Sequence, residues 1–319
     1  MKQVVSYGRG PTDVELVDAP LRPPGAGELA LELIAAPVHP ANLLQMEGRY
    51  GVARPGPFGL GAEGAFRVVE SMTEGFDVGD VVLAMSGECW TEAMTARARS
   101  VTKVSRDVDV EQASMMRANP GTALAMLRDI VDLKPGDWVA QNAANSSVGV
   151  NVVKIAKARG LKTLNVVRRE SAVQPLLDLG ADIVLAADDS APKTDQQASI
   201  AFDAIGGRAT GALSAMAGYG GTVVTYGVLS GEECALSPHD IVFRGVSLTG
   251  FWLAEWYGGA TPEKIVAHHA ELEGLMRDGV IGAAVAARYP LAEIGKAVAH
   301  ASEGGRDGKI LLTGPAYEG

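Results

Sequence analysis

The feature that most constrains the fold is a regular alternation of strand-like and helix-like segments between residues 138 and 251. The strand-like segments are short apolar runs, and the segments between them carry Ala, Val and Leu at helical spacing. This alternation is typical of a parallel sheet with helices on both faces. We therefore expect a doubly wound α/β domain over residues 116–254. The expected strands are 138–144, 162–167, 182–187, 198–206, 222–227 and 246–251, and the expected helices are 147–160, 171–181 and 210–218.

The two flanks of this region have a different pattern. The first 115 residues are strand-like and are broken often by Gly and Pro, which predicts a compact, irregular β domain. From residue 255 onward the sequence indicates an amphipathic helix that begins near Pro262 and stops near Gly279, a second helix around 291–302 and a last strand. We expect these elements to return to the first domain, so that residues 1–115 and 255–319 form one domain.

Composition argues against several classes of function. The 319 residues include 38 acidic and 28 basic ones, a net charge of −10, and such a chain is a poor partner for nucleic acid. No apolar run approaches the roughly 18 residues of a membrane span, and the N-terminus lacks the apolar core of a signal peptide. Cys89 and Cys234 stand far apart, which argues against a disulfide framework or a thiolate zinc cluster. We expect a cytoplasmic protein with neither a membrane nor a nucleic-acid partner.

A candidate nucleotide site lies where the first strand of the repeat meets its helix, at QNAANSSVG (141–149). Backbone N–H groups and a helix N-terminus in such a turn can face a pyrophosphate. As a glycine fingerprint the segment is weak, because Gly149 is its single glycine. Gly149 suits close packing of the helix on the strand, and an ordinary turn is equally compatible with this segment alone.

The end of the next strand indicates which dinucleotide is bound. In dinucleotide enzymes this position holds an acid for NAD or a cation for the extra phosphate of NADP. Here the run KTLNVV is followed by Arg168 and Arg169, whose guanidinium groups can bind a phosphate monoester in a bidentate manner. The residues therefore favour NADPH. The alternative is that both arginines are solvated and pair with Glu170.

With these residues in view, the sequence resembles the 2-enoyl thioester reductases, a zinc-free branch of the medium-chain dehydrogenase/reductase superfamily. The resemblance extends over almost the full chain. It implies a fold of the α/β class, with a GroES-like β-rich catalytic domain that is split around a Rossmann domain. The stretches that carry it are MEGRYG, GLGAEG, ANPGTALAML, QNAANSSVG, NVVRRE, GFWL and GKILL.

The resemblance also implies roles for individual residues. Tyr50 matches the catalytic tyrosine of the family. Two positions depart from the family pattern: Ser147 stands where Gly is usual, and Ala62 replaces a common Asn. The residues implied in NADPH binding are Asn119, Asn145, Ser146, Ser147, Val148, Arg168, Arg169, Glu170, Tyr226, Gly227, Val228, Leu229, Phe251, Trp252, Leu253 and Lys309.

The ligands of a catalytic zinc are missing from the positions where related dehydrogenases hold them. His39 stands at the position of the first Cys, and Ala62 replaces the usual His before Glu63. A single histidine cannot replace three ligands, so we expect no metal. The absence of a mitochondrial targeting extension also favours a cytoplasmic enzyme of bacterial type.

Without a metal, the residues favour reduction of a conjugated C=C bond over reduction of an isolated carbonyl, because charge can then flow to the carbonyl oxygen. We expect an NADPH-dependent oxidoreductase of fatty acid metabolism that acts on the CH–CH group of a trans-2-enoyl thioester linked to CoA or acyl carrier protein. Hydride would reach the β carbon, and Tyr50, protonated at neutral pH, would supply the α proton or hold the enolate. The alternative is that Tyr50, on an exposed turn, only lines the pocket.

Two other functions remain open at this point. A zinc-free NADPH quinone or alkenal reductase shares the fold and needs no proton donor at Tyr50. A catalytically inactive NADPH-binding sensor or oligomeric partner belongs to a different functional class. The family resemblance further implies a homodimer formed through the last Rossmann strand, around residues 246–250.

Overall fold

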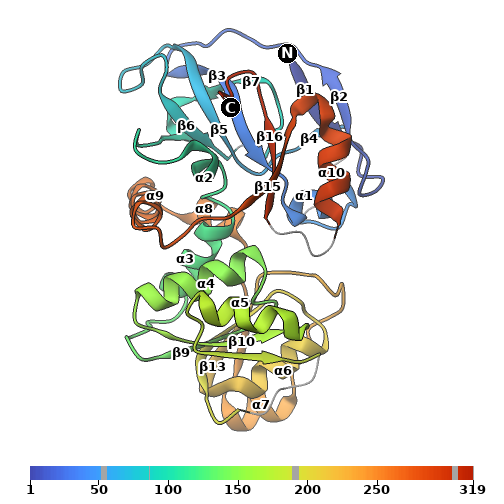
Figure 1. Cartoon of the computed structure of the whole chain (residues 1–319), viewed down its shortest axis with the longest axis vertical. Coiled ribbons are helices and arrows are strands. Elements are labelled where there is room, and N and C mark those ends of the chain that lie inside the picture. The colour runs from blue at the N-terminus through green and yellow to red at the C-terminus, as the bar shows by residue number, and fades with distance from the viewer. Residues whose placement is uncertain (52–55, 86, 189–193, 304–307, 319) are drawn as a thin grey trace. The chain divides into compact units, whose positions relative to one another are not determined.

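The computed structural model describes residues 1–51, 56–85, 87–188, 194–303 and 308–318 (Figure 1). The chain divides into two compact units. Unit 1 consists of Met1–Ala118 and Gly282–Gly319, and unit 2 consists of Asn119–Ile281. Within the described residues, no helix has both the length and the apolar character needed to cross a bilayer.

Unit 2 contains a six-stranded sheet in which every pair of neighbouring strands is parallel. The strand order is β11-β10-β9-β12-β13-β14, so the chain winds outward from β9 in one direction and from β12 in the other. This confirms the predicted doubly wound sheet. The strands are β9 (Trp138–Gln141), β10 (Lys162–Val167), β11 (Ile183–Ala186), β12 (Ala198–Asp203), β13 (Ala217–Thr225) and β14 (Ser247–Gly250).

The helices of unit 2 follow from the same alternation. Figure 1 shows α4 and α5 (green) beside β9 and β10. Close packing of α4 depends on Gly149, because a Cβ there would lie 2.5 Å from the carbonyl oxygen of Ala144. The helices are α3 (Asn119–Asp129), α4 (Ser147–Ala158), α5 (Val173–Asp178), α6 (Arg208–Met216), α7 (Pro238–Arg244), α8 (Leu253–Gly259) and α9 (Pro262–Arg277), with a 3₁₀ turn at Glu170–Ala172.

The predicted amphipathic helix near residues 262–279 is present as α9, but the structure places it in unit 2, whereas we expected residues 255–281 in the first domain. Ion pairs explain this difference. Glu271 on α9 accepts from Arg128 on α3 and from Arg159 at the end of α4, at 2.9 and 2.5 Å. Trp256 on α8 donates through Nε1 to Asp129, at 2.8 Å. The sequence predicted the helix but did not show which element would cover it.

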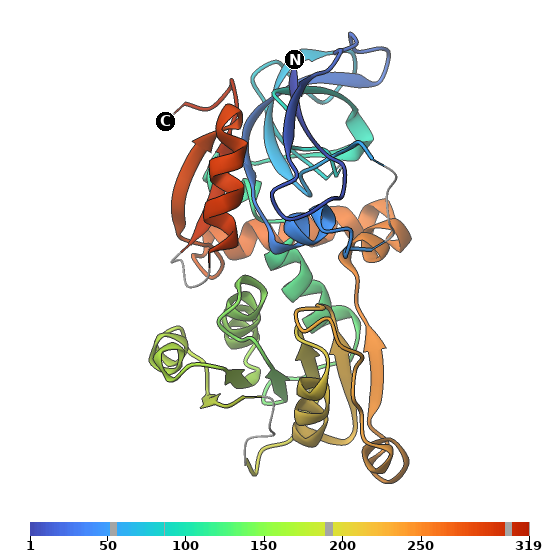
Figure 2. The same cartoon turned by 90° about the vertical axis from the view of Figure 1, so that its right-hand side faces the viewer.

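Unit 1 is rich in β structure, as predicted. A small sheet has the order β2-β1-β4, and a larger one has the order β15-β16-β3-β5-β6-β8, with β7 also paired to β3. The C-terminal strands β15 and β16 join the larger sheet through β3, and α10 lies alongside them (Figure 2). Residues 282–318 thus lie in unit 1.

The elements of unit 1 enclose a core that includes the fully buried Trp90, whose Nε1 donates to the carbonyl oxygen of Pro37 at 3.2 Å. The strands are β1 (Lys2–Ser6), β2 (Glu15–Asp18), β3 (Glu28–Pro37), β4 (Phe58–Gly59), β5 (Gly64–Ser71), β6 (Val81–Ala84), β7 (Ala93–Arg97), β8 (Val101–Lys103), β15 (Val285–Pro290) and β16 (Lys309–Thr313). The helices are α1 (Pro40–Met46), α2 (Val110–Ser114) and α10 (Ile294–Ser302), with 3₁₀ turns at Ala98–Ser100 and Leu291–Glu293.

Candidate functional site

The predicted nucleotide-binding residues of unit 2 gather at one edge of its sheet. The carboxyl ends of parallel strands meet at the same edge, and in doubly wound folds ligands bind there, where the strand order reverses. In this sheet the reversal lies between β9 and β12. The predicted segments that follow strand ends at this edge are 145–148 after β9, 168–170 after β10, 226–229 after β13 and 251–253 after β14.

The turn between β9 and α4 is built to present a helix N-terminus. Ser146 is the N-cap of α4 and accepts a hydrogen bond from the N–H of Gly149 at 3.2 Å. Asn119 donates through Nδ2 to the hydroxyl of Ser147 at 3.1 Å, so this predicted residue lies beside the turn. Ala143 enters the turn with φ of +45°, a conformation that costs a non-glycine residue about 1 kcal/mol or more. The N-terminus of α4 is therefore available to an anion.

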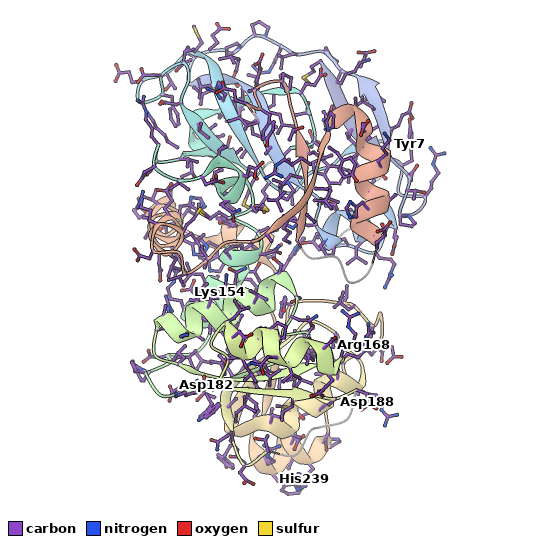
Figure 3. All side chains as sticks on the ribbon, in the orientation of Figure 1. Tyr7, Lys154, Arg168, Asp182, Asp188 and His239 are labelled. Atoms are coloured by element: carbon purple, nitrogen blue, oxygen red, sulfur yellow. The ribbon has the colours of Figure 1, made fainter. Side chains whose placement is uncertain are left out.

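The β10 end presents Arg168, Arg169 and Glu170 to solvent. Within the described part of the chain, both arginines are solvated, as in the alternative that we considered, and no ion pair joins either of them to Glu170. Figure 3 shows Arg168 and Asp188 on one side of unit 2 and Asp182 on the other. Asp182 is bonded to Lys162 at 2.8 Å, at the amino end of β10. The two guanidinium groups are thus exposed at the carboxyl end of β10.

Asp203, at the end of β12, organises this edge and was missed by the sequence analysis. It is fully buried, and its Oδ1 accepts from Asn142 Nδ2 at 2.7 Å and from the N–H groups of Ile205 and Gly206 at 2.9 and 3.0 Å. Its Oδ2 accepts from the Thr210 hydroxyl at 2.6 Å. An acidic residue at the end of an apolar strand, followed by two glycines, was the signal that could have revealed it.

Tyr226 and Gly227 follow β13 and lie against the loop after β12. A Cβ on Gly227 would lie 2.4 Å from the carbonyl oxygen of Ala204, so only glycine fits without a shift. Burial raises the pKa of the Tyr226 phenol, and the neighbouring Ser146 opposes part of that effect. The phenol oxygen is buried and has no hydrogen-bond partner of good geometry among the described residues. An unsatisfied donor near the α4 N-cap fits an anionic ligand.

The remaining predicted residues after the strand ends of unit 2 are less enclosed. Val228 and Leu229 are exposed at 48% and 57%, and Trp252 at 38%. Phe251 is held by its backbone N–H, which donates to the carbonyl oxygen of Thr225 at 2.9 Å. These residues therefore lie at the same edge as the turn and the arginines, with side chains that are available for contact.

In unit 1 the most unusual feature is a buried pair formed by His39 and Glu63, which are 3% and 1% exposed. Nε2 of His39 lies 2.7 Å from Oε1 of Glu63, and because a carboxylate only accepts, the imidazole donates. Oε2 of Glu63 accepts from the N–H groups of Arg117 and Ala118, both at 2.9 Å. Both carboxylate oxygens are thus satisfied inside the protein.

Burial lowers the pKa of His39 below its usual value, although the hydrogen bond to Glu63 opposes this. The positive charge of Lys309 lowers the pKa of His39 further, so the structure places this predicted residue near the pair. Lys309 is itself buried, at the start of β16 in unit 1. A neutral imidazole that donates to a carboxylate results at neutral pH.

Tyr50 lies in unit 1, four residues after the end of α1. Its neighbours Gly48, Arg49 and Gly51 are exposed, as expected of a turn, whereas the Tyr50 side chain itself is half-buried. The turn is closed by backbone hydrogen bonds: Gly48 N–H donates to Gln45, and Arg49 N–H donates to Leu44.

The residues of unit 1 do not fit a catalytic zinc. His39 and Glu63 hold each other, and Ala62 has no ligand atom to offer. Throughout the ranges that the structure describes, no three His, Cys, Asp or Glu side chains form a group that could hold a metal ion. We therefore derive no step through a metal.

Comparisons with known proteins agree with this geometry. Residues 147–267 match the model of the family described as zinc-binding dehydrogenase. A mitochondrial enoyl-acyl-carrier-protein reductase of Caenorhabditis elegans is 37% identical over 269 residues, which cover 81% of this chain and 78% of that protein.

Solved structures have the same fold. A protein from Bacillus thuringiensis described as an NADPH:quinone reductase superposes with a TM-score of 0.90 at 24% identity, over 98% of both chains. A mitochondrial 2-enoyl thioester reductase heterodimer from Candida tropicalis gives a TM-score of 0.85 at 21% identity, over 98% of this chain and 99% of that chain. Unit 1 and unit 2 thus correspond to the expected GroES-like and Rossmann folds. The chain belongs to the medium-chain dehydrogenase/reductase superfamily and, within it, to the family of enoyl-acyl-carrier-protein reductases.

Proposed function

We propose that this protein reduces the C=C bond of a trans-2-enoyl thioester with NADPH. The family membership makes the chain an NADPH-dependent oxidoreductase that acts on CH–CH groups. The observation that carries the choice of substrate is the 37% identity, over 81% of the chain, to a protein named for enoyl reduction on an acyl carrier protein. The thioester carrier, CoA or acyl carrier protein, is part of the proposal.

The residues at the edge of the unit 2 sheet fit the proposed cofactor. Bound NADPH supplies the hydride for the β carbon of the substrate. Arg168 and Arg169 would hold its 2′-phosphate through charge-assisted hydrogen bonds. The N-terminus of α4, with Asn145, Ser146, Ser147 and Val148, would hold the pyrophosphate, and Tyr226 would donate to the same anion. Further contacts that we propose come from Asn119, Glu170, Gly227, Val228, Leu229, Phe251, Trp252, Leu253 and Lys309.

Tyr50 is the proposed catalytic residue. Its hydroxyl can donate a hydrogen bond to the developing enolate or a proton to the α carbon. The half-buried position of Tyr50 and the closed turn that holds it support this role. No metal is part of the proposal.

The decisive experiment follows NADPH oxidation with a short trans-2-enoyl-CoA and, in parallel, with a simple quinone. We expect rapid enoyl turnover by the wild type and a loss of about 100-fold or more in kcat for Tyr50→Phe. Quinone turnover that survives the substitution, with the enoyl-CoA inert, would establish the second candidate, a zinc-free quinone reductase. The 26% identity to a mycobacterial quinone oxidoreductase supports that second candidate.

A homodimer through β14 is a further part of the proposal. All four residues of β14 are exposed, and Leu248 is 39% exposed although it lies in a strand. On α7, Ile241, Val242 and Phe243 are exposed as well, at 50%, 68% and 70%. An open strand edge beside apolar side chains favours association. Analytical ultracentrifugation should give a dimer for the wild type and a monomer for Leu248→Lys.

The cellular compartment is a separate proposal. The Caenorhabditis elegans relative is named a mitochondrial enzyme, so the relatives do not support the predicted cytoplasmic location. The predicted cytoplasmic location therefore stays a proposal. Immunoblots of fractionated cells will decide it, since recovery in a mitochondrial fraction would contradict the proposal.

A further inference from the structure

The proposed chemistry does not use the most deeply buried ionisable groups of unit 1, His39 and Glu63. Burying both side chains is costly unless they are hydrogen-bonded, and here Nε2 of His39 and both oxygens of Glu63 are. Such an arrangement requires a structural or functional reason. The helix α1, whose N-cap is His39, leads from this pair toward Tyr50.

The first step of this connection is that His39 is the N-cap of α1. Its backbone N–H donates to Oδ1 of Asn42 at 2.9 Å, and Asn42 N–H donates back to the carbonyl oxygen of His39 at 2.9 Å. Asn42 is fully buried, and Pro40 occupies the first turn. The hydrogen bond from the His39 ring to Glu63 therefore fixes the start of α1 to the strand-rich part of unit 1.

The second step is that the other end of α1 is equally defined. Gly48 has φ of +67°, the left-handed conformation that closes a Schellman motif, and Arg49 N–H donates to the carbonyl oxygen of Leu44 at 2.8 Å. Met46 is fully buried, and its carbonyl oxygen accepts from Gly10 N–H at 2.9 Å. Tyr50 leaves this motif directly, so its backbone position follows that of α1.

We propose that the His39–Glu63 pair is a positioning pair for Tyr50. It holds the N-cap of a seven-residue helix whose far end carries the tyrosine. A helix this short has little stability of its own, so its placement depends on such contacts. Displacement of a reacting group by about 1 Å can lower turnover about 100-fold. The inference rests on the proposed function, because it assigns the pair a role through Tyr50.

The sharpest variant is Glu63→Gln. The amide oxygen can still accept from the N–H groups of Arg117 and Ala118, but the amide nitrogen then faces Nε2 of His39. The imidazole must adopt its other tautomer to accept from that amide, which changes the bonding at its second nitrogen. The size and shape of the side chain are unchanged, so the effect reports on the hydrogen bond.

The test is a double-mutant cycle with Tyr50→Phe, measured by kcat on the enoyl-CoA and by NADPH affinity from fluorescence titration. We expect Glu63→Gln to lower kcat about 10-fold when Tyr50 is present, in line with the loss of an aligned proton donor. The same change in the Tyr50→Phe background should have no further effect on kcat. NADPH affinity should be unchanged in all four proteins. An equal loss of kcat in both backgrounds, or no loss in either, would overturn the inference.

The outcome for Tyr50→Phe alone separates this inference from the proposed function. If that variant retains full enoyl turnover, the catalytic role of Tyr50 fails; if it loses turnover but the two substitutions are additive, only the positioning role fails. Asp80→Asn is the matched control, since Asp80 is a buried carboxylate of unit 1 paired with Lys103, and it should leave kcat unchanged. Should Glu63→Gln not fold, His39→Gln provides the same cycle with a smaller, few-fold effect.

Discussion

Two buried carboxylates, one in each unit, are stabilised by different kinds of hydrogen-bond donor. Asp203 in unit 2 and Glu63 in unit 1 are both almost fully buried, and each accepts from two backbone N–H groups and from neighbouring side chains. The side-chain donors for Asp203 are the Asn142 amide and the Thr210 hydroxyl, neither of which titrates. The donor for Glu63 is the imidazole of His39, which does.

The two carboxylates also differ in the elements that they connect. Asp203 joins the ends of neighbouring parallel strands, at the edge where the proposed cofactor binds. Glu63 joins the N-cap of a short helix to the backbone of Arg117 and Ala118, which are distant in the sequence. Stability and nucleotide binding should therefore depend on Asp203, and turnover and pH dependence on His39 and Glu63.

The largest expected effect is on stability in unit 2. Asp203→Ala should lower the free energy of unfolding by about 3–5 kcal/mol, because several buried donors lose their acceptor at once. Asp203→Asn retains an oxygen for Asn142, Ile205 and Gly206 and should cost about 1–2 kcal/mol. Urea unfolding measures both values. A loss below about 1 kcal/mol for the alanine variant would show that the hydrogen bonds of Asp203 do not stabilise unit 2.

The next effect concerns the nucleotide edge. Replacing Arg168 and Arg169 together by Ala should weaken NADPH binding about 100-fold, since two charge-assisted contacts to a phosphate are lost. NADH binding should change little. Lys162→Ala, at the opposite end of β10, is the control and should leave both affinities unchanged. A parallel loss of NADH affinity would show that the arginines do not read the 2′-phosphate.

A smaller effect tests the titrating partner in unit 1. Because burial lowers the pKa of His39 in the folded state, the unfolded chain binds more protons below pH 6.5. The contribution of His39 to the free energy of unfolding is fully present above pH 6.5. It decreases as the pH falls toward the pKa of His39 in the folded state, by at most about 1.4 kcal/mol per pH unit. Urea unfolding at pH 7.5 and 5.5 should show a smaller acid loss for His39→Gln than for the wild type. Equal losses would mean that His39 does not cause the pH dependence.

The smallest effect concerns backbone strain at the nucleotide turn. Ala143→Gly removes the cost of a left-handed alanine but makes the unfolded chain more flexible, so we expect a net gain of about 0.5 kcal/mol in the free energy of unfolding. NADPH affinity should not change if the strain only shapes the turn. A clear loss of affinity would indicate that the methyl group itself contributes to binding.

Sequence reasoning predicted unit 2 well because its signals are local and repeat. Apolar runs and helical spacing identify the parallel strands, and parallel strands bring their ends to one edge. Arg168 and the residues after Asn145 could thus be assigned to a common site without coordinates. Asp203 was missed because an acidic residue after an apolar strand is as typical of an ordinary solvent-exposed strand end as of a buried carboxylate that accepts several hydrogen bonds.

The sequence of unit 1 carries weaker signals for the residues of its site. His39 was recognised only as a residue that replaces a metal ligand, and its bond to Glu63 depends on a chain that brings residues 39 and 63 together. The amphipathic pattern of α9 predicted the helix, but its membership of unit 2 rests on Glu271, Arg128 and Arg159, which are remote in sequence. Periodicity identifies a buried face but not the element that covers it.

The sequence by itself determined the doubly wound sheet, the β-rich character of the first domain and the cationic strand end that favours NADPH. These follow from local propensity, from the two periods of hydrophobic residues and from the common edge shared by parallel strands. Only the tertiary structure decided that Asp203 organises the switch point, that α9 packs in unit 2, and that His39 and Glu63 form a buried pair beside Lys309. Those features depend on contacts between residues far apart in the chain, which no local pattern encodes.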